Sequence, residues 1–238
     1  WYAPNNAVLT VVGDIDEGEI VAAVERHFGE IPANPSIPAH PDLTLTAPLG
    51  GEIRKTIRDR VPEARVHFAF RAPVLSAPLI PAIEIATQIL AGGKGSRLYR
   101  RLVRDEQVAQ DVSLSLLPFA GGASIIVGAA TVRPGVENDA VERAFVDELE
   151  RLAADGPTPS EMERAKALTE SEELLVRSDP EELADAVGMY ATLLGDPGRI
   201  NRDLDLALAV TAEQVQIAAR LFAKENRIVL WYLPEDRP

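Results

Sequence analysis

The feature that most constrains the fold of this 238-residue chain is a proline-rich segment in its N-terminal quarter. Five prolines fall between Ile31 and Pro48, at positions 32, 35, 38, 41 and 48. Because proline lacks a backbone N–H and fixes φ, this density is incompatible with a helix or a central strand. We therefore predict an extended linker over residues 33–48, with a domain boundary there.

The residues before the linker have the pattern of one strand followed by one helix. Ala7–Val12 is an apolar, β-rich run closed by Gly13, which predicts a strand buried on both faces or nearly so. Asp16 is a good helix N-cap, and apolar residues then recur at helical spacing up to Phe28. About 30 residues cannot bury these apolar faces alone. We expect the unit to pack against other sequence or another copy of the chain.

The residues after the linker predict a longer series of strands and helices. In order, we expect strands at 53–58 and 65–71, helices at 79–90 and 97–104, strands at 108–117 and 123–132, helices at 139–153, 159–177, 180–194 and 212–222, and a strand at 227–232. A hairpin and a late returning strand indicate an α+β fold. The prediction is a two-layer sandwich, an antiparallel or mixed sheet with helices on one face.

Charge and composition exclude several classes of function. Asp and Glu total 37 against 24 Lys and Arg, giving a formal net charge of −13. Such a surface repels phosphate backbones and anionic lipids, so we expect neither a nucleic-acid partner nor a membrane partner. No apolar run approaches the ~18 residues that span a bilayer. With no cysteine in the chain, disulfides, Cys-ligated zinc and thiol catalysis are excluded.

The histidine spacing does not fit a zinc site within the chain. There are three histidines, His27, His40 and His67, and no two are four residues apart, so no helix offers H-x-x-E-H. There is also no G-x-S-x-G, and the Gly-rich segment 92–96 lacks the spacing of a phosphate-binding loop. From these patterns we predict no catalytic residue and no metal ligand in this chain.

Four stretches carry more specific motifs. Trp1–Asp14 reads W-Y-A-P-N-N-A-V-L-T-V-V-G-D, and the helix after it leads into His27–Pro32, H-F-G-E-I-P. Leu90–Ala109 contains L-A-G-G-K-G-S-R-L-Y-R-R-L before the hairpin, and Asn226–Glu235 forms the last strand. In order and spacing these stretches resemble the M16 (pitrilysin/insulinase) zinc peptidase family over nearly the whole chain.

The resemblance implies an M16/LuxS-like metallohydrolase fold and a division into domains. In that family the zinc ligands, H-x-x-E-H and a downstream Glu, lie in the preceding part of the first domain. Residues 1–32 would then be the end of a first, zinc-bearing domain, and residues 49–238 a second, non-catalytic domain. The full-length protein would hold zinc, and this segment none. The implied partners are the upstream catalytic domain or a partner M16 subunit, and a peptide substrate, and we expect a dimer or self-association.

The implied function is that of the non-catalytic C-terminal part of a zinc metalloendopeptidase, forming chamber wall and interface and inactive alone. The alternative is a catalytically inactive M16-fold subunit with a structural or peptide-binding role. Family members that contact substrate opposite the zinc carry an Arg and a Tyr in the hairpin, whereas residues 112–131 contain neither. Both interpretations therefore stay open, with an unrelated α+β binding module as a third.

The candidate substrate-binding residues are Arg97 and Arg101. Arginine pairs bidentately with carboxylates, so these side chains could hold the C-terminal carboxylate of a peptide. The alternative is structural, with both arginines bridging the helix pair to Asp105, Glu106 or the linker.

Overall fold

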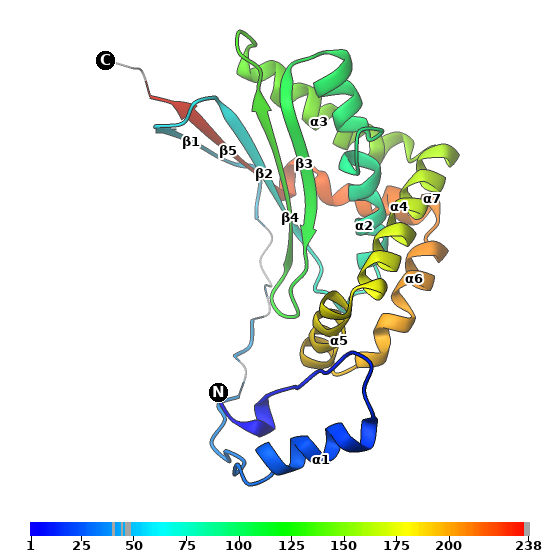
Figure 1. The fold of residues 1–238 in the computed structure, drawn as a ribbon. Helices are drawn as coiled ribbons and strands as arrows, with labels where there is room; N and C mark the ends of the chain where they lie inside the picture. Colours follow the sequence, from blue (N-terminus) through cyan, green and yellow to red (C-terminus); the bar gives the residue numbers. More distant parts are fainter. Residues whose placement is uncertain (40, 44, 46–48, 236–238) are drawn as a thin grey trace. The chain divides into compact units, whose positions relative to one another are not determined.

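The computed structural model describes residues 1–39, 41–43, 45 and 49–235 of the chain (Figure 1). The chain divides into two compact units, residues 1–42 with 170–204, and residues 43–169 with 205–238. The division crosses one long helix, α4 (Pro159–Ser178). Among the described residues, no helix is both long and apolar enough to cross a membrane.

The first unit contains the helices expected from their capping residues. Helix α1 (Glu17–Phe28) begins at Asp16, whose carboxylate accepts a hydrogen bond from the Glu19 N–H. Helix α5 (Pro180–Leu194) begins at Asp179 in the same way. A 3₁₀ turn at Pro197–Asn201 follows. Residues 32–34, 37–39 and 41–43 form no helix or strand, and His40 and Pro48 lie outside the described residues.

The strand predicted over Ala7–Val12 is wrong. The structure has no strand there, and the side chains of Val8, Leu9 and Val11 are 52%, 59% and 42% exposed. A strand is stabilised by hydrogen bonds to a neighbouring strand, and the described residues of this unit provide none. The segment therefore has the apolar pattern of a strand, but the described residues of this unit contain no neighbouring strand to pair with it.

The second unit is built on a mixed five-stranded sheet, which confirms the predicted α+β class. Its strands are β1 (Ile53–Asp59), β2 (Arg65–Ala72), β3 (Ala109–Leu117), β4 (Ser124–Val132) and β5 (Arg227–Pro234). Their order across the sheet is β1-β5-β2-β4-β3, with β1 and β5 parallel and every other pair antiparallel. The predicted hairpin is β3–β4.

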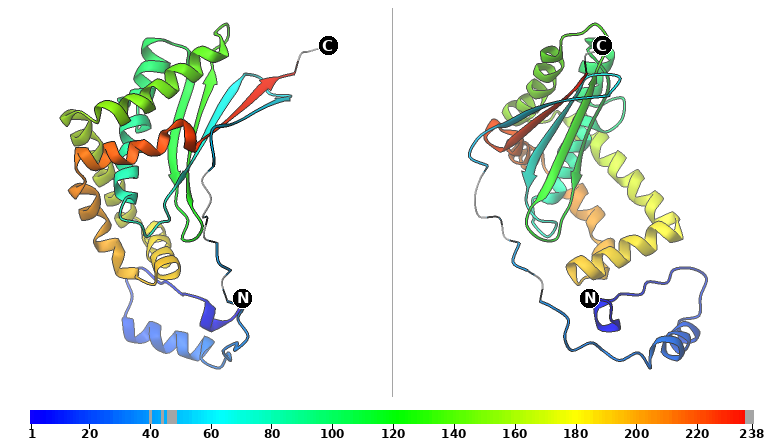
Figure 2. Two further views of the ribbon diagram at one scale, coloured as in Figure 1. Left: turned by 180° about the vertical axis from the view of Figure 1, so that it is seen from behind. Right: turned by 90° about the vertical axis from the view of Figure 1, so that its left-hand side faces the viewer.

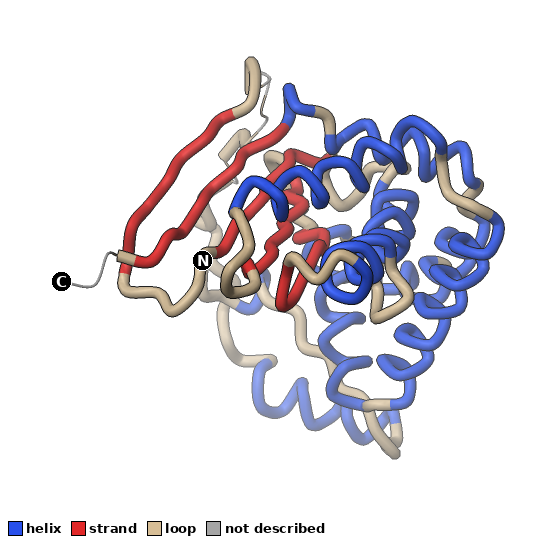
Figure 3. Tube along the Cα trace, turned by 90° about the horizontal axis from the view of Figure 1, so that it is seen from above, coloured by secondary structure: helices blue, strands red, loops and turns tan. Residues whose placement is uncertain are grey.

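Helices cover one face of this sheet (Figures 2 and 3). They are α2 (Ile80–Ala91), a π-helical segment (Tyr99–Asp105) and α3 (Asn138–Asp155), with α7 (Ala212–Ala219) packed against α2 and α3. The first half of α4 and the short α6 (Asp203–Ala209), whose first two residues belong to the first unit, are the other helices of this part of the chain. The sequence predicted all of these helices except α6. Thr211 opens α7 with the predicted capping box, and Thr158 does the same for α4.

The core lies between the sheet and these helices. Val66, Phe68 and Phe70 of β2 point inward, as the alternation predicted, and all are at most 1% exposed. Phe68 stacks on Phe145 of α3 with ring centroids 4.4 Å apart. Gly128 of β4 lies beneath this contact, where a Cβ atom would sit 3.0 Å from Phe145 Cζ. The close approach of α3 to the sheet therefore requires glycine at this position.

Candidate functional site

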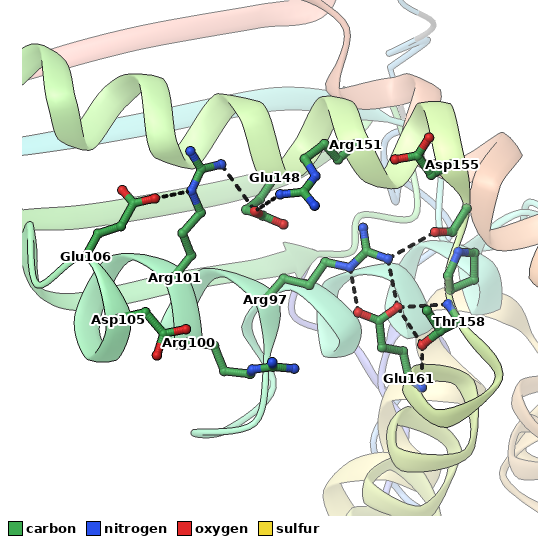
Figure 4. A pocket seen from close by; sticks show the side chains of 12 residues that line it. Arg97, Arg100, Arg101, Asp105, Glu106, Glu148, Arg151, Asp155, Thr158 and Glu161 are labelled. Carbon is green, nitrogen blue, oxygen red and sulfur yellow. Dashed lines mark hydrogen bonds and ion pairs between the residues drawn. The ribbon is translucent and has the colours of Figure 1, made fainter.

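The two predicted arginines line a charged cavity on the helical side of the second unit. The cavity has a volume of about 670 Å³ and lies between the π-helical segment, the C-terminal end of α3 and the start of α4 (Figure 4). Ten of its twelve lining residues are charged or polar, and the full set is Arg97, Arg100, Arg101, Asp105, Glu106, Glu148, Arg151, Asp155, Gly156, Pro157, Thr158 and Glu161.

Arg97 is bound by the first turn of α4. Its Nε and one terminal nitrogen each donate to a carboxylate oxygen of Glu161 at 2.7 Å, and the same terminal nitrogen donates to the Gly156 carbonyl at 3.0 Å. Burial disfavours the charge on Glu161, but hydrogen bonds from Arg97 and Thr158 outweigh it and lower the pKa of Glu161 to about 2. Hydrogen bonding to Glu161 raises the pKa of Arg97. The pair joins α4 to the helical turn that leads into the π-helical segment.

Arg101 is shared among three carboxylates. Its nitrogens donate to Glu106 at 2.7 Å and to Asp147 and Glu148 at 3.2 Å. Glu148 is 6% exposed and also accepts from Arg151 at 3.1 Å. The contact with Glu106 is the structural role that sequence analysis offered as the alternative. Sequence analysis did not predict Glu148 as a partner of Arg101. The signal was available, because Glu148 falls on the apolar stripe of α3, and a Glu that is buried there needs a cationic partner.

Unlike the other arginines of the cavity, Arg100 has no carboxylate of the described residues at hydrogen-bond distance. It is exposed, and in Figure 4 its side chain extends away from Arg97 and Arg101. The cavity thus contains two predicted arginines already paired with carboxylates of the chain, and one free arginine. An incoming anion would meet Arg100 without displacing an internal carboxylate.

The opposite face of the sheet is a second candidate surface. No described helix of this unit lies on it (Figure 2). Strand register places the following side chains on this face: Ile53, Lys55, Ile57, Asp59, Arg65, His67, Ala69, Arg71, Asp111, Ser113, Ser115, Leu117, Ile125, Val127, Ala129, Thr131, Ile228, Leu230 and Tyr232. Burial, with a smaller effect of Arg65, lowers the pKa of His67 and so favours the neutral ring. The central strand β2 contributes Arg65, His67 and Arg71 to this face, and the strands on either side of it, β5 and β4, contribute mostly apolar side chains.

The first unit has an apolar groove of its own. It has a volume of about 330 Å³ and is lined by Leu9, Val11, Ile15, Glu17, Ile20, Val21, Val24 and Glu25. Val21 and Phe28 are 50% and 51% exposed, so α1 presents its apolar side to solvent. An uncovered apolar surface of this kind is typical of an interaction site.

The described residues do not fit a zinc ion. His27 lies in the last turn of α1 and His67 in the middle of β2, and His40 lies outside the described residues. Within the described part of the chain, no group of three His, Cys, Asp or Glu side chains is arranged to hold a metal. No zinc chemistry is therefore assigned to this segment.

Comparison with known proteins identifies the fold. The family model described as the peptidase M16 inactive domain matches residues 1–169. The chain belongs to the M16 peptidase family. An uncharacterized zinc protease of Mycobacterium tuberculosis is 28% identical over 220 residues, covering 92% of this chain and 50% of the relative. The chain thus spans about half the length of the curated relatives it matches.

Solved structures agree on the fold of this M16 domain. A protease from Helicobacter pylori superimposes with a TM-score of 0.86 at 17% identity, covering 94% of this chain and 54% of that protein. A mutant of the ferredoxin protease FusC, solved in complex with Arabidopsis ferredoxin, gives a TM-score of 0.69 at 18% identity, covering 94% of this chain and 24% of that protein.

Proposed function

We propose that this chain is the non-catalytic C-terminal part of an M16-type zinc metalloendopeptidase. It forms wall and interface for peptide cleavage by a zinc site outside this segment. The observation that carries the proposal is the match of residues 1–169 to the M16 inactive domain, in a chain half as long as relatives named zinc proteases.

The proposed division into domains rests on the proline-rich segment and the family match, and the exposed surface of the first unit supports it. Residues 1–32 would complete an upstream zinc-bearing domain, residues 33–48 would be the linker, and residues 49–238 the second domain. The exposed side chains of Val8, Leu9 and Val11 support this, because a strand formed there needs a neighbouring strand. The groove beside α1 would be covered by the catalytic domain, by a partner M16 subunit or by a second copy of the chain.

An unfolded peptide is the proposed substrate. The structure of FusC with ferredoxin supports a protein-derived substrate for this fold. The uncovered face of the sheet supports the proposal that this chain forms a chamber wall facing the peptide. Apolar side chains that no helix covers can contact an extended chain. Contact of Arg97 and Arg101 with a peptide carboxylate stays a prediction. Such a carboxylate would have to compete with Glu161 or Glu106.

The test begins with the coding sequence upstream of Trp1. Any segment found there is expressed together with this chain, and cleavage of a quenched fluorogenic unfolded peptide is measured. We expect an H-x-x-E-H motif in that segment, and cleavage that requires both parts and is lost when the motif's Glu is replaced by Gln. Absence of the motif, with peptide binding but no cleavage, would instead favour the inactive M16-fold subunit.

A further inference from the structure

The uncovered face of the sheet carries an excess of positive charge in a strongly acidic chain. Lys55, Arg65 and Arg71 project from it, against the carboxylates of Asp59 and Asp111 at its margins. The chain as a whole has a net charge of −13. With three basic and two acidic side chains, this face lacks the excess of negative charge that the chain as a whole carries, so it does not repel a negatively charged ligand.

Arg65 differs from Arg97 and Arg101 because no carboxylate of the described residues lies within hydrogen-bond distance of its guanidinium. Its nearest carboxylate oxygen, Asp111 Oδ1, lies 3.7 Å from a terminal nitrogen, beyond hydrogen-bond distance. Its Nε has no hydrogen-bond partner among the described residues. The side chain is 43% exposed, so its outer nitrogens can be reached from solvent. A carboxylate arriving from solvent could bind this guanidinium without displacing an internal hydrogen bond.

The neighbours of Arg65 add a hydroxyl and an apolar shelf. Tyr232 of β5 stands opposite Arg65, and Ile57 of β1 stands opposite Tyr232. The Tyr232 ring packs edge-on against His67, with centroids 5.6 Å apart, which restrains the ring on the face that also carries Arg65. A phenol hydroxyl can donate to a carboxylate. Ile57 and Leu230 then offer apolar contact to the residues that flank such a group.

We propose that this corner of the sheet, Arg65 with Tyr232 and Ile57, is a specificity site for a carboxylate on an extended, otherwise apolar peptide. The proposal rests on the proposed function, since it names the class of peptide that the wall selects. The carboxylate can belong to an acidic side chain or to the C-terminus of the peptide. The chemistry is the same in both cases, and the peptides used in the test separate them.

The test measures binding of labelled apolar peptides of about 12 residues to the 238-residue chain by fluorescence anisotropy at low salt. One peptide carries a central Glu pair and an amidated C-terminus, one carries Gln in place of Glu with a free C-terminus, and one carries Lys with an amidated C-terminus. The variants are Arg65→Gln and Tyr232→Phe. Arg60→Gln in the turn after β1 is the control, because it makes the same charge change outside both candidate sites. Arg100→Gln tests the charged cavity as the competing site for the carboxylate.

We expect one of the two carboxylate-bearing peptides to bind about tenfold more tightly than the Lys peptide, with affinity that falls as salt rises. Arg65→Gln should abolish most of this preference and Tyr232→Phe part of it, whereas Arg60→Gln and Arg100→Gln should both retain it. Equal binding of all three peptides, or loss of the preference with Arg100→Gln instead of Arg65→Gln, would overturn the site while leaving the proposed function intact. Failure to bind any peptide would count against both.

Discussion

Replacing Glu161 tests whether the charged cavity is held together by its ion pairs. Glu161 accepts two hydrogen bonds from Arg97 at 2.7 Å and one from the Thr158 N–H at 2.8 Å, and so connects α4 to the helical turn before the π-helical segment. The Glu161→Gln variant keeps the size of the side chain and an oxygen for the helix cap, but removes the charge. We expect a less stable second unit at pH 7, with its fold retained.

The magnitude follows from the pKa of Glu161, which is lowered from 4.5 to about 2. A shift of about 2.5 units corresponds to at most ~3.4 kcal/mol at ~1.36 kcal/mol per unit. The pair lies at the wall of an open cavity, where solvent screening leaves about 1–2 kcal/mol of this. Because the pKa is depressed in the folded state, this stabilisation is complete well above pH 4.5 and is lost as the pH falls towards about 2.

The assay is urea unfolding followed by the fluorescence of Trp231, in a Trp1→Phe background. Trp231 lies in β5 of the same unit. Glu161→Gln should lower the unfolding free energy at pH 7 by about 1–2 kcal/mol, and most of that difference should vanish by pH 3. Glu163→Gln, an exposed position on the same turn, is the matched control and should change little. Equal stability of Glu161→Gln and wild type at pH 7, or a difference independent of pH, would refute the reasoning.

Three further predictions address the end of α2, the metal and the first unit. Arg164→Ala should lower the free energy of unfolding in urea by about 1.5–3 kcal/mol, because Arg164 donates a hydrogen bond of 2.7 Å to the Gly92 carbonyl at the end of α2. Arg143→Ala is the control and should change this free energy little, because Arg143 is exposed. Elemental analysis of the dialysed chain should find no stoichiometric zinc and a peptide assay no cleavage, and one tightly held zinc per chain would contradict this. Sedimentation should show self-association that Val21→Asp weakens, since Val21 lines the apolar groove, and a monomer at all concentrations would contradict it.

The helices were predicted well because their signals are local. Pro180–Leu194 has the predicted bounds, since Asp179 caps its first turn and a left-handed Gly195 ends it. The alternation of Arg65–Arg71 likewise identified which side chains of β2 are buried. Helix α6 (Asp203–Ala209) was missed because, at seven residues, it is too short for helical periodicity to distinguish it from a loop.

The charged cavity could be predicted only in part, because its partners are distant in sequence. Glu106, five residues from Arg101, was anticipated as a partner. Glu161 lies 64 residues from Arg97, and Glu148 lies 47 from Arg101. Only the packing of α3 and α4 beside the π-helical segment brings these carboxylates to the arginines. Spacing within one helix carries no information about such a contact.

The segment Ala7–Val12, which was predicted as a strand and forms none, shows that an apolar pattern alone does not determine a strand. The pattern specifies apolar side chains suited to burial, but a strand exists only where a neighbouring strand offers N–H and C=O groups. The described part of the first unit offers α1 and the helices of residues 170–204, which cannot supply that ladder. The same residues match the M16 family. Burial of Val8, Leu9 and Val11 in a sheet is thus a property of the assembled protein that we propose, and protection of their amides from hydrogen exchange on adding the upstream part would demonstrate it.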